Sequence, residues 1–125
     1  IDQRTLPLNS TYNYSTTGAG VHAYVIDSGI RATHTEFIGR IGNGQDFVND
    51  GQGTNDCDGH GTHVAGIAAG GNPQISGNGV AKNSNIIAIQ IFYYTSDCGG
   101  ETAPCLRTDE ARWIKGLERV YELRT

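Results

Sequence analysis

The chain has 125 residues, about the length of one ordinary domain, and its 18 glycines and 37% hydrophobic residues describe a turn-rich chain that can still bury a core. Its net charge of −4 and the lack of a lysine- and arginine-rich run argue against a nucleic-acid-binding protein. No apolar stretch approaches the ~18 residues of a membrane span, which argues against a membrane-spanning protein.

The first predicted strand covers Val21–Ile26 and follows a polar arm, residues 2–17. Its side chains are apolar on both faces, which is typical of a strand covered on both sides. Ser28 and Gly29 then end the strand, so that Asp27 stands at its carboxyl end. Active sites in open α/β sheets gather at the carboxyl ends of strands. Asp27 is therefore a candidate site residue.

The second candidate, His60, opens a predicted helix of small residues, Thr62–Ala69. The glycines on either side of it, Gly59 and Gly61, allow a sharp turn and a close approach of backbone. The positive end of a helix disfavours a charged imidazole. We therefore expect His60 to be kept neutral, in the state in which it can accept a proton.

A second central strand is predicted in the β-branched segment that begins at Asn85, and a long loop, residues 93–107, follows it. Thr108 is predicted to cap a last helix, with Asp109 and Glu110 in its first turn. The apolar face of that helix is expected to pack on the sheet; it consists of Ala111, Ile114, Leu117 and Tyr121. The alternation of strands and helices favours an α/β fold with a parallel sheet.

Asp27 and His60 together could activate a serine hydroxyl. A serine hydroxyl needs an imidazole to take its proton, and the imidazole needs a carboxylate on its other nitrogen. Taken singly, an Asp at a strand end is usually a turn former, and a His beside glycine is usually structural or solvated. As a pair, they are two of the three members of a hydrolytic triad.

Two segments carry a resemblance to a known family. Tyr24-Val25-Ile26-Asp27-Ser28-Gly29-Ile30 and Asp58-Gly59-His60-Gly61-Thr62-His63-Val64-Ala65-Gly66 resemble, in this order, the subtilisin-like serine peptidases. The segments 21–27 and 46–50 resemble the proteinase K and aqualysin branch. The resemblance implies a three-layer, parallel-sheet subtilisin-like fold and a secreted endopeptidase that acts on proteins or peptides. It also implies catalytic roles for Asp27 and His60 and a buried structural place for His63.

The same resemblance implies that residues 1–125 are the N-terminal portion of a catalytic domain whose fold continues beyond them. The family's nucleophile motif, Gly-Thr-Ser-Met-Ala, and its oxyanion asparagine do not occur in these residues. We therefore expect the chain to be inactive alone, and to associate with the missing C-terminal half or with a second copy of itself. The alternative is a non-catalytic binding domain derived from such an enzyme.

Three cysteines allow one disulfide and one free thiol. The resemblance implies the pairing Cys57–Cys98, because aqualysin-like relatives join a cysteine before the His motif to one in the later loop. A local bridge, Cys98–Cys105, is the competing prediction. The cysteine and histidine spacings do not favour a zinc site.

The resemblance also implies one structural metal ion. Asp2 and Gln3, with Asn9 and Thr11, align with an N-terminal calcium site of aqualysin-like relatives. Calcium prefers oxygen ligands, which these side chains can supply. The competing interpretation is a polar surface arm without a metal.

Overall fold

The computed structural model describes residues 2–72 and 79–124. The sequence also predicts a loop over residues 70–79, and most of it lies outside the described residues. The elements, in chain order, are β1 (His22–Asp27), the 3-10 helix η1 (Thr35–Phe37), β2 (Gln45–Asp46), α1 (His60–Ala69), β3 (Asn85–Gln90), β4 (Tyr93–Thr95), β5 (Cys105–Arg107) and α2 (Glu110–Leu123). None of the helices among these residues is long and apolar enough to cross a membrane.

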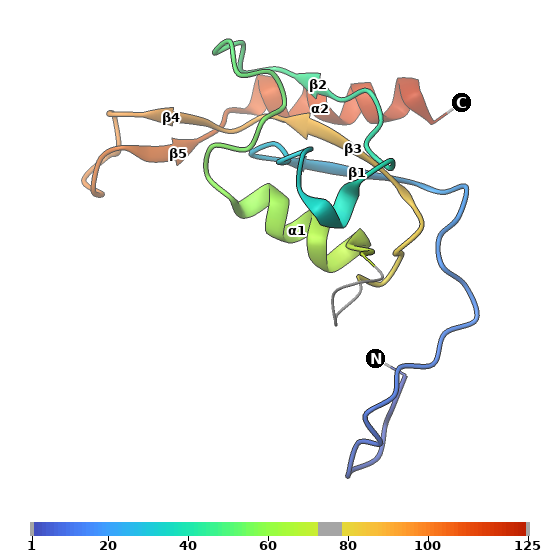
Figure 1. Cartoon of the computed structure of the whole chain (residues 1–125). Helices are drawn as coiled ribbons and strands as arrows, with labels where there is room; N and C mark the ends of the chain where they lie inside the picture. The colour runs from blue at the N-terminus through green and yellow to red at the C-terminus, as the bar shows by residue number, and fades with distance from the viewer. Residues whose placement is uncertain (1, 73–78, 125) are drawn as a thin grey trace.

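The central sheet is parallel, with the strand order β1-β3-β2. β1 and β3 run in register along their whole length, from His22 opposite Asn85 to Asp27 opposite Gln90. Figure 1 shows α1 on one face of the sheet and α2 on the other. The predicted α/β fold with a parallel sheet is confirmed, and β1 begins and ends one residue later than expected.

Alternate residues of β3 fill two cores. Ile86 and Ala88 face α1, where they pack with a cluster that includes Val25 and Ala65. Ile87 and Ile89 face the other way, toward side chains of α2 that include Val120. Successive strand residues point to opposite faces, so β3 must be apolar throughout. Full burial of each large aliphatic side chain stabilises the fold by about 1.5–3 kcal/mol.

The prediction of which face of α2 packs on the sheet is wrong. Ile114 and Leu117 are each 56% exposed and Tyr121 is 64% exposed. The buried residue of the helix is Gly116, where a Cβ would lie 3.2 Å from the side chains of both Ile26 and Ile91. Because glycine allows this close approach, the helix turns this side, rather than its most apolar side, toward the sheet.

The N-terminal end of α2 also differs from expectation. The cap is Asp109, whose carboxylate accepts a hydrogen bond from the backbone N–H of Arg112. Thr108, the predicted cap, instead donates its hydroxyl to the backbone oxygen of Ile91 at 2.7 Å. It thereby ties the start of α2 to the end of the central sheet.

The segment predicted as a long loop contains an antiparallel hairpin, β4 and β5, in which Thr95 lies opposite Cys105. A disulfide joins Cys98 to Cys105, with the Cα atoms 5.8 Å apart. The pairing Cys57–Cys98 is therefore wrong, and Cys57 is an exposed free thiol. The hairpin explains the outcome, because Cys105 lies on β5 and Cys98 lies in the loop that joins β4 to β5, at the separation that a disulfide requires.

Candidate active site

Asp27 and His60 meet at the carboxyl end of β1. The Nδ1 atom of His60 lies 2.8 Å from Oδ1 and 2.9 Å from Oδ2 of Asp27. The Asp27 side chain is 12% exposed, whereas the His60 side chain is 66% exposed. A neutral ring that donates Nδ1–H to Asp27 carries its lone pair on Nε2. The arrangement can therefore orient an imidazole that accepts a proton at its other nitrogen.

Two glycines make this contact geometrically accessible. Gly59, the N-cap of α1, has a φ of 104°, which favours glycine. At Gly61, a Cβ would lie 2.2 Å from the backbone oxygen of Gly29 and 3.2 Å from the Asp27 side chain. Only a residue without a side chain allows the first turn of α1 to lie this close to the end of β1. The helix also begins at His60 itself, two residues before the predicted start.

The pKa of His60 does not shift in the expected direction. The pKa of His60 is raised above its ordinary value of 6.5, first by the hydrogen bond to Asp27 and then by that carboxylate's charge. The charges of Asp58 and Asp56 act in the same direction. The neighbouring carboxylates therefore favour the protonated ring, which takes up a proton more readily than a free histidine.

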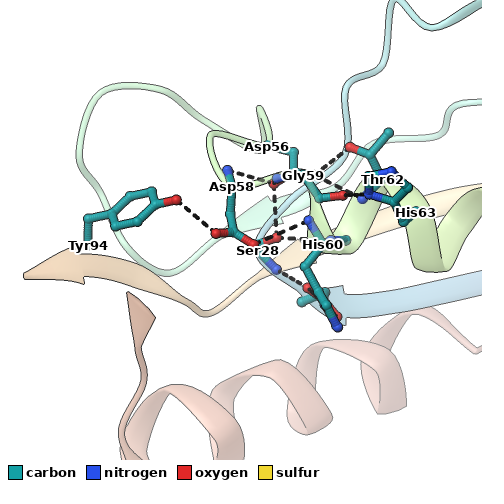
Figure 2. Close-up of polar contacts among 10 residues, drawn as sticks. Ser28, Asp56, Asp58, Gly59, His60, Thr62, His63 and Tyr94 are labelled. Atoms are coloured by element: carbon teal, nitrogen blue, oxygen red, sulfur yellow. Dashed lines mark hydrogen bonds and ion pairs between the residues drawn. The ribbon is translucent and has the colours of Figure 1, made fainter. Parts of the chain in front are cut away.

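The turn before α1 is organised by Asp56 (Figure 2). Its Oδ1 accepts hydrogen bonds from Ser28 Oγ at 2.9 Å and from Gly59 N at 2.8 Å. Its Oδ2 accepts from Thr62 N at 2.9 Å and from the Thr62 hydroxyl. Burial acts to raise the pKa of Asp56, but the hydrogen bonds from Thr62, Gly59 and Ser28 together lower it. The group is therefore held as a carboxylate.

Asp58 connects the same turn to the hairpin. Its Oδ2 accepts from His60 N at 3.3 Å, and its Oδ1 accepts from the hydroxyl of Tyr94, on β4, at 2.8 Å. This hydrogen bond, which Figure 2 also shows, is the main cause that raises the pKa of Tyr94. The hairpin is thus joined to the residues that lead into His60.

An apolar cavity of about 530 Å³ lies beside the pair. It is lined by Ile26, Asp27, Asp58, His60, Phe92, Leu106 and Trp113. A larger cavity, of about 660 Å³, contains His63 and Cys57 but neither Asp27 nor His60. A ligand that reacts at the Asp27–His60 pair would therefore occupy the smaller cavity.

One further sequence interpretation needs correction. His63, expected to be buried, is exposed, and its Nδ1 lies 2.6 Å from the backbone oxygen of Gly59. Ser28 lies in a bend directly after β1, as its place in the sequence predicts; it is also buried, and its hydroxyl joins Asp56 to the backbone N–H of Gly61.

Asp56, Ser28, Thr62 and Tyr94 were not singled out as site residues from the sequence. One signal could have found Asp56: a short polar residue just ahead of a helix is a preferred partner for free helical N–H groups. No comparable signal marks Tyr94, which reaches Asp58 through a hairpin that was itself predicted as a loop.

The candidate metal residues lie in the N-terminal arm, which Figure 1 shows extending away from the sheet. Gln3 Oε1 accepts from Asn9 N at 2.9 Å, Asn9 Oδ1 accepts from Thr11 N at 3.0 Å, and Asp2 Oδ2 accepts from Asn13 N at 2.8 Å. These are oxygen atoms, the ligand type that calcium takes, so the donor chemistry fits. Among the described residues, no group of three or more His, Cys, Asp or Glu is gathered around a metal position.

Comparisons with known proteins agree with the fold and with the motifs. Residues 18–108 match the Subtilase family, to which this chain belongs. It is 50% identical over 100 residues to an extracellular serine proteinase of Thermus sp. (strain Rt41A), a match covering 80% of this chain and 22% of that protein. It is 48% identical over 92 residues to alkaline serine exoprotease A of Vibrio alginolyticus, covering 74% and 16%.

Solved structures give the same result. The crystal structure of a cold adapted subtilisin-like serine proteinase matches with a TM-score of 0.75 and 41% identity, over 98% of this chain and 40% of that one. The structure of MycP1 with its N-terminal propeptide removed matches with a TM-score of 0.55 and 30% identity, over 83% and 27%. The chain therefore has a partial subtilisin-like fold and spans less than half of each of these relatives.

Proposed function

We propose that this chain supplies two members of a serine endopeptidase triad, with His60 as the general base and Asp27 as the residue that orients it. The observation that carries the proposal is the contact of His60 Nδ1 with both oxygens of Asp27, at 2.8 and 2.9 Å. A ring that donates Nδ1–H to Asp27 carries its lone pair on Nε2, which can take the proton of a nucleophile. Asp27 then stabilises the imidazolium that forms.

The nucleophilic serine comes, in this proposal, from outside the 125 residues. Ser28 is the serine joined to this network, and its hydroxyl already donates to Asp56. The substrate is a protein or peptide chain, and the apolar cavity between Phe92, Leu106 and Trp113 suits one of its side chains. The Thermus relative is named an extracellular proteinase, which supports a secreted protein.

Fluorophosphonate labelling, read by denaturing mass spectrometry, tests the proposal. We expect a label on a serine carried by a second polypeptide or by a longer form of the chain. His60→Ala should abolish the label, whereas His63→Ala, on the same helix, should retain it. A label on a serine within residues 1–125 would contradict the proposal. If neither the chain nor any longer form is labelled, the alternative of a non-catalytic binding domain is favoured.

The partner that we propose is a C-terminal segment carrying the serine. β1 is an outer strand of the described sheet, and it pairs with β3 alone. An open strand edge is a surface on which another strand can pair. A self-dimer is the competing arrangement, and mass measurement of the purified protein under native conditions distinguishes the two.

We further propose that Asp2 and Gln3 hold a structural calcium ion, which would stabilise the N-terminal arm. The side-chain oxygens of Asn9 and Thr11 lie within the same hydrogen-bonded group. A ligand that binds only the folded state raises the midpoint of thermal unfolding. We expect calcium to raise this midpoint in the wild type but not in Asp2→Asn, with Asp50→Asn as the control. An unchanged midpoint in the wild type would contradict the proposal.

A further inference from the structure

The Asp56 carboxylate joins three segments of the site. Its hydrogen-bond donors are Ser28, directly after β1, Asp58 and Gly59, in the turn before α1, and Thr62, in the first turn of α1. The donors include backbone groups from the second and third segments. Asp56 therefore connects the chain that carries Asp27 with the helix that carries His60, without a hydrogen bond to either of those side chains.

Two hydroxyl groups cross-link these segments in opposite directions. Ser28 and Thr62 each give their single hydroxyl proton to Asp56. Each hydroxyl oxygen is then left to accept, and Ser28 Oγ accepts from Gly61 N at 3.0 Å, while Thr62 Oγ1 accepts from Arg31 N at 3.0 Å. The hydroxyl beside β1 thus binds the helix, and the hydroxyl on the helix binds the chain that follows β1.

We propose that Asp56 is a positioning residue for His60, one that holds the start of α1 against the end of β1 so that the ring meets Asp27. Ser28, which Asp56 fixes through its hydroxyl, also donates its backbone N–H to Asp27 Oδ1 at 2.7 Å. Both partners of the pair are therefore located by one network. The inference deepens the proposed role of His60, but it concerns a geometry that can be measured without the serine or a substrate.

The competing explanation is that Asp56 acts on His60 only as a charge. The carboxylates that raise the pKa of His60 belong to Asp27, Asp58 and Asp56, and the effect of the Asp58 charge exceeds that of Asp56. Charge alone therefore predicts that Asp58→Asn lowers the pKa of His60 more than Asp56→Asn does. If Asp56 positions the ring, Asp56→Asn lowers the pKa of His60 more than Asp58→Asn does. The reason is that the loss of the Asp56 carboxylate also weakens the hydrogen bond between His60 and Asp27.

An NMR titration of the chain with isotope-labelled histidine separates the two explanations. We expect the wild type and Asp58→Asn to keep a slowly exchanging Nδ1 proton on His60. Asp56→Asn places an amide N–H group against two or more of the five donors that bind the Asp56 carboxylate. In this variant we expect the slowly exchanging Nδ1 proton to be lost and the pKa of His60 to be lower than in Asp58→Asn. The opposite order of pKa values, with the Nδ1 proton retained in Asp56→Asn, would overturn the proposal.

If Asp56→Asn does not fold, Thr62→Val tests the positioning role of Asp56 instead. This substitution keeps the side-chain shape, changes no charge and removes the hydroxyl that donates to Asp56. We expect faster exchange of the His60 Nδ1 proton and a lowered pKa, with the signals of Trp113 unchanged as a report on the fold. An unchanged Nδ1 exchange rate and pKa in Thr62→Val would refute the positioning role. Failure of the proposed function is distinguishable, because it appears as absent fluorophosphonate labelling with the NMR behaviour intact.

Discussion

Gly61 lies against Asp27 so closely that a Cβ on the glycine would be 3.2 Å from the Cβ of the aspartate. The same Cβ would be 2.2 Å from the backbone oxygen of Gly29, which is a distance that no folded structure tolerates. The start of α1 and the end of β1 therefore meet backbone against backbone. This contact places His60, the first residue of the helix, within reach of the carboxylate.

Gly61→Ala should consequently destabilise the chain. Inserting a methyl group into a closely packed contact costs about 1–3 kcal/mol, and chemical denaturation measures this as a lower free energy of unfolding. Gly66→Ala is the matched control, since a Cβ at Gly66, in the same helix, meets no atom within 4 Å. It should raise stability by about 0.5–1 kcal/mol, because alanine favours the helix. Equal effects of the two changes would contradict the packing argument.

Asp27→Asn should lower the pKa of His60 toward its ordinary value of 6.5, because the largest causes of its elevation come from Asp27. NMR titration of the histidine ring signals measures the change directly. The control is Asp50→Asn, which removes a carboxylate in an exposed loop that is not among the causes of the elevated value. A pKa that stays elevated in Asp27→Asn would mean that the contact between the two side chains does not persist in solution.

Asp56 should make the fold sensitive to acid. Its pKa in the folded chain is below the ordinary value of 3.8, so its contribution is complete above that value and is lost as the pH falls through the folded-state pKa. We expect the free energy of unfolding of the wild type to decrease below about pH 4. Asp56→Asn should be less stable near neutral pH and should show a flatter decrease in acid. If the free energy of unfolding falls with pH equally in the wild type and in Asp56→Asn, the protonation of Asp56 does not cause the loss of stability in acid.

The disulfide should be found between Cys98 and Cys105, with Cys57 available to an alkylating reagent before reduction. Peptide mapping under non-reducing conditions tests both statements at once. Cys57→Ser should leave the map of the bridge unchanged, whereas Cys105→Ser should eliminate it. A linked peptide containing Cys57 and Cys98 in the wild type would instead support the pairing implied by the family resemblance.

The parts of the fold that could be predicted from the sequence are those with a local signal. The continuous apolar run of β1 and the glycines around His60 gave the strand, the helix and the two residues that meet between them. The prediction of the buried face of α2 is wrong because it rests on side-chain hydrophobicity alone. In the structure, the contact depends on the absence of a side chain at Gly116.

The expected direction of the pKa shift of His60 is wrong because it depends on residues that are not its sequence neighbours alone. The sequence shows that the residue is near a helix end, but not that Asp27, Asp56 and Asp58 converge on it from a strand end and a turn. The hairpin is not apparent from the sequence because its strands are three residues each and are separated by a segment that contains Gly99, Gly100 and Pro104. Such short strands acquire their stability from pairing and from the disulfide, neither of which has a periodic pattern in the sequence.

The hydrogen bonds that satisfy the free N–H groups of α1 are also those that locate the ring of His60. In many enzymes the groups that perform the chemistry lower the stability of the fold, so that an increase in stability can reduce activity. At Ser28, Asp56 and Thr62 the two requirements coincide, because a change that frees the helix also displaces the ring. A substitution at any of these three positions is therefore expected to lower stability and to disturb the contact between His60 and Asp27. A laboratory selection for heat resistance alone should retain all three residues, even if it never tests for activity.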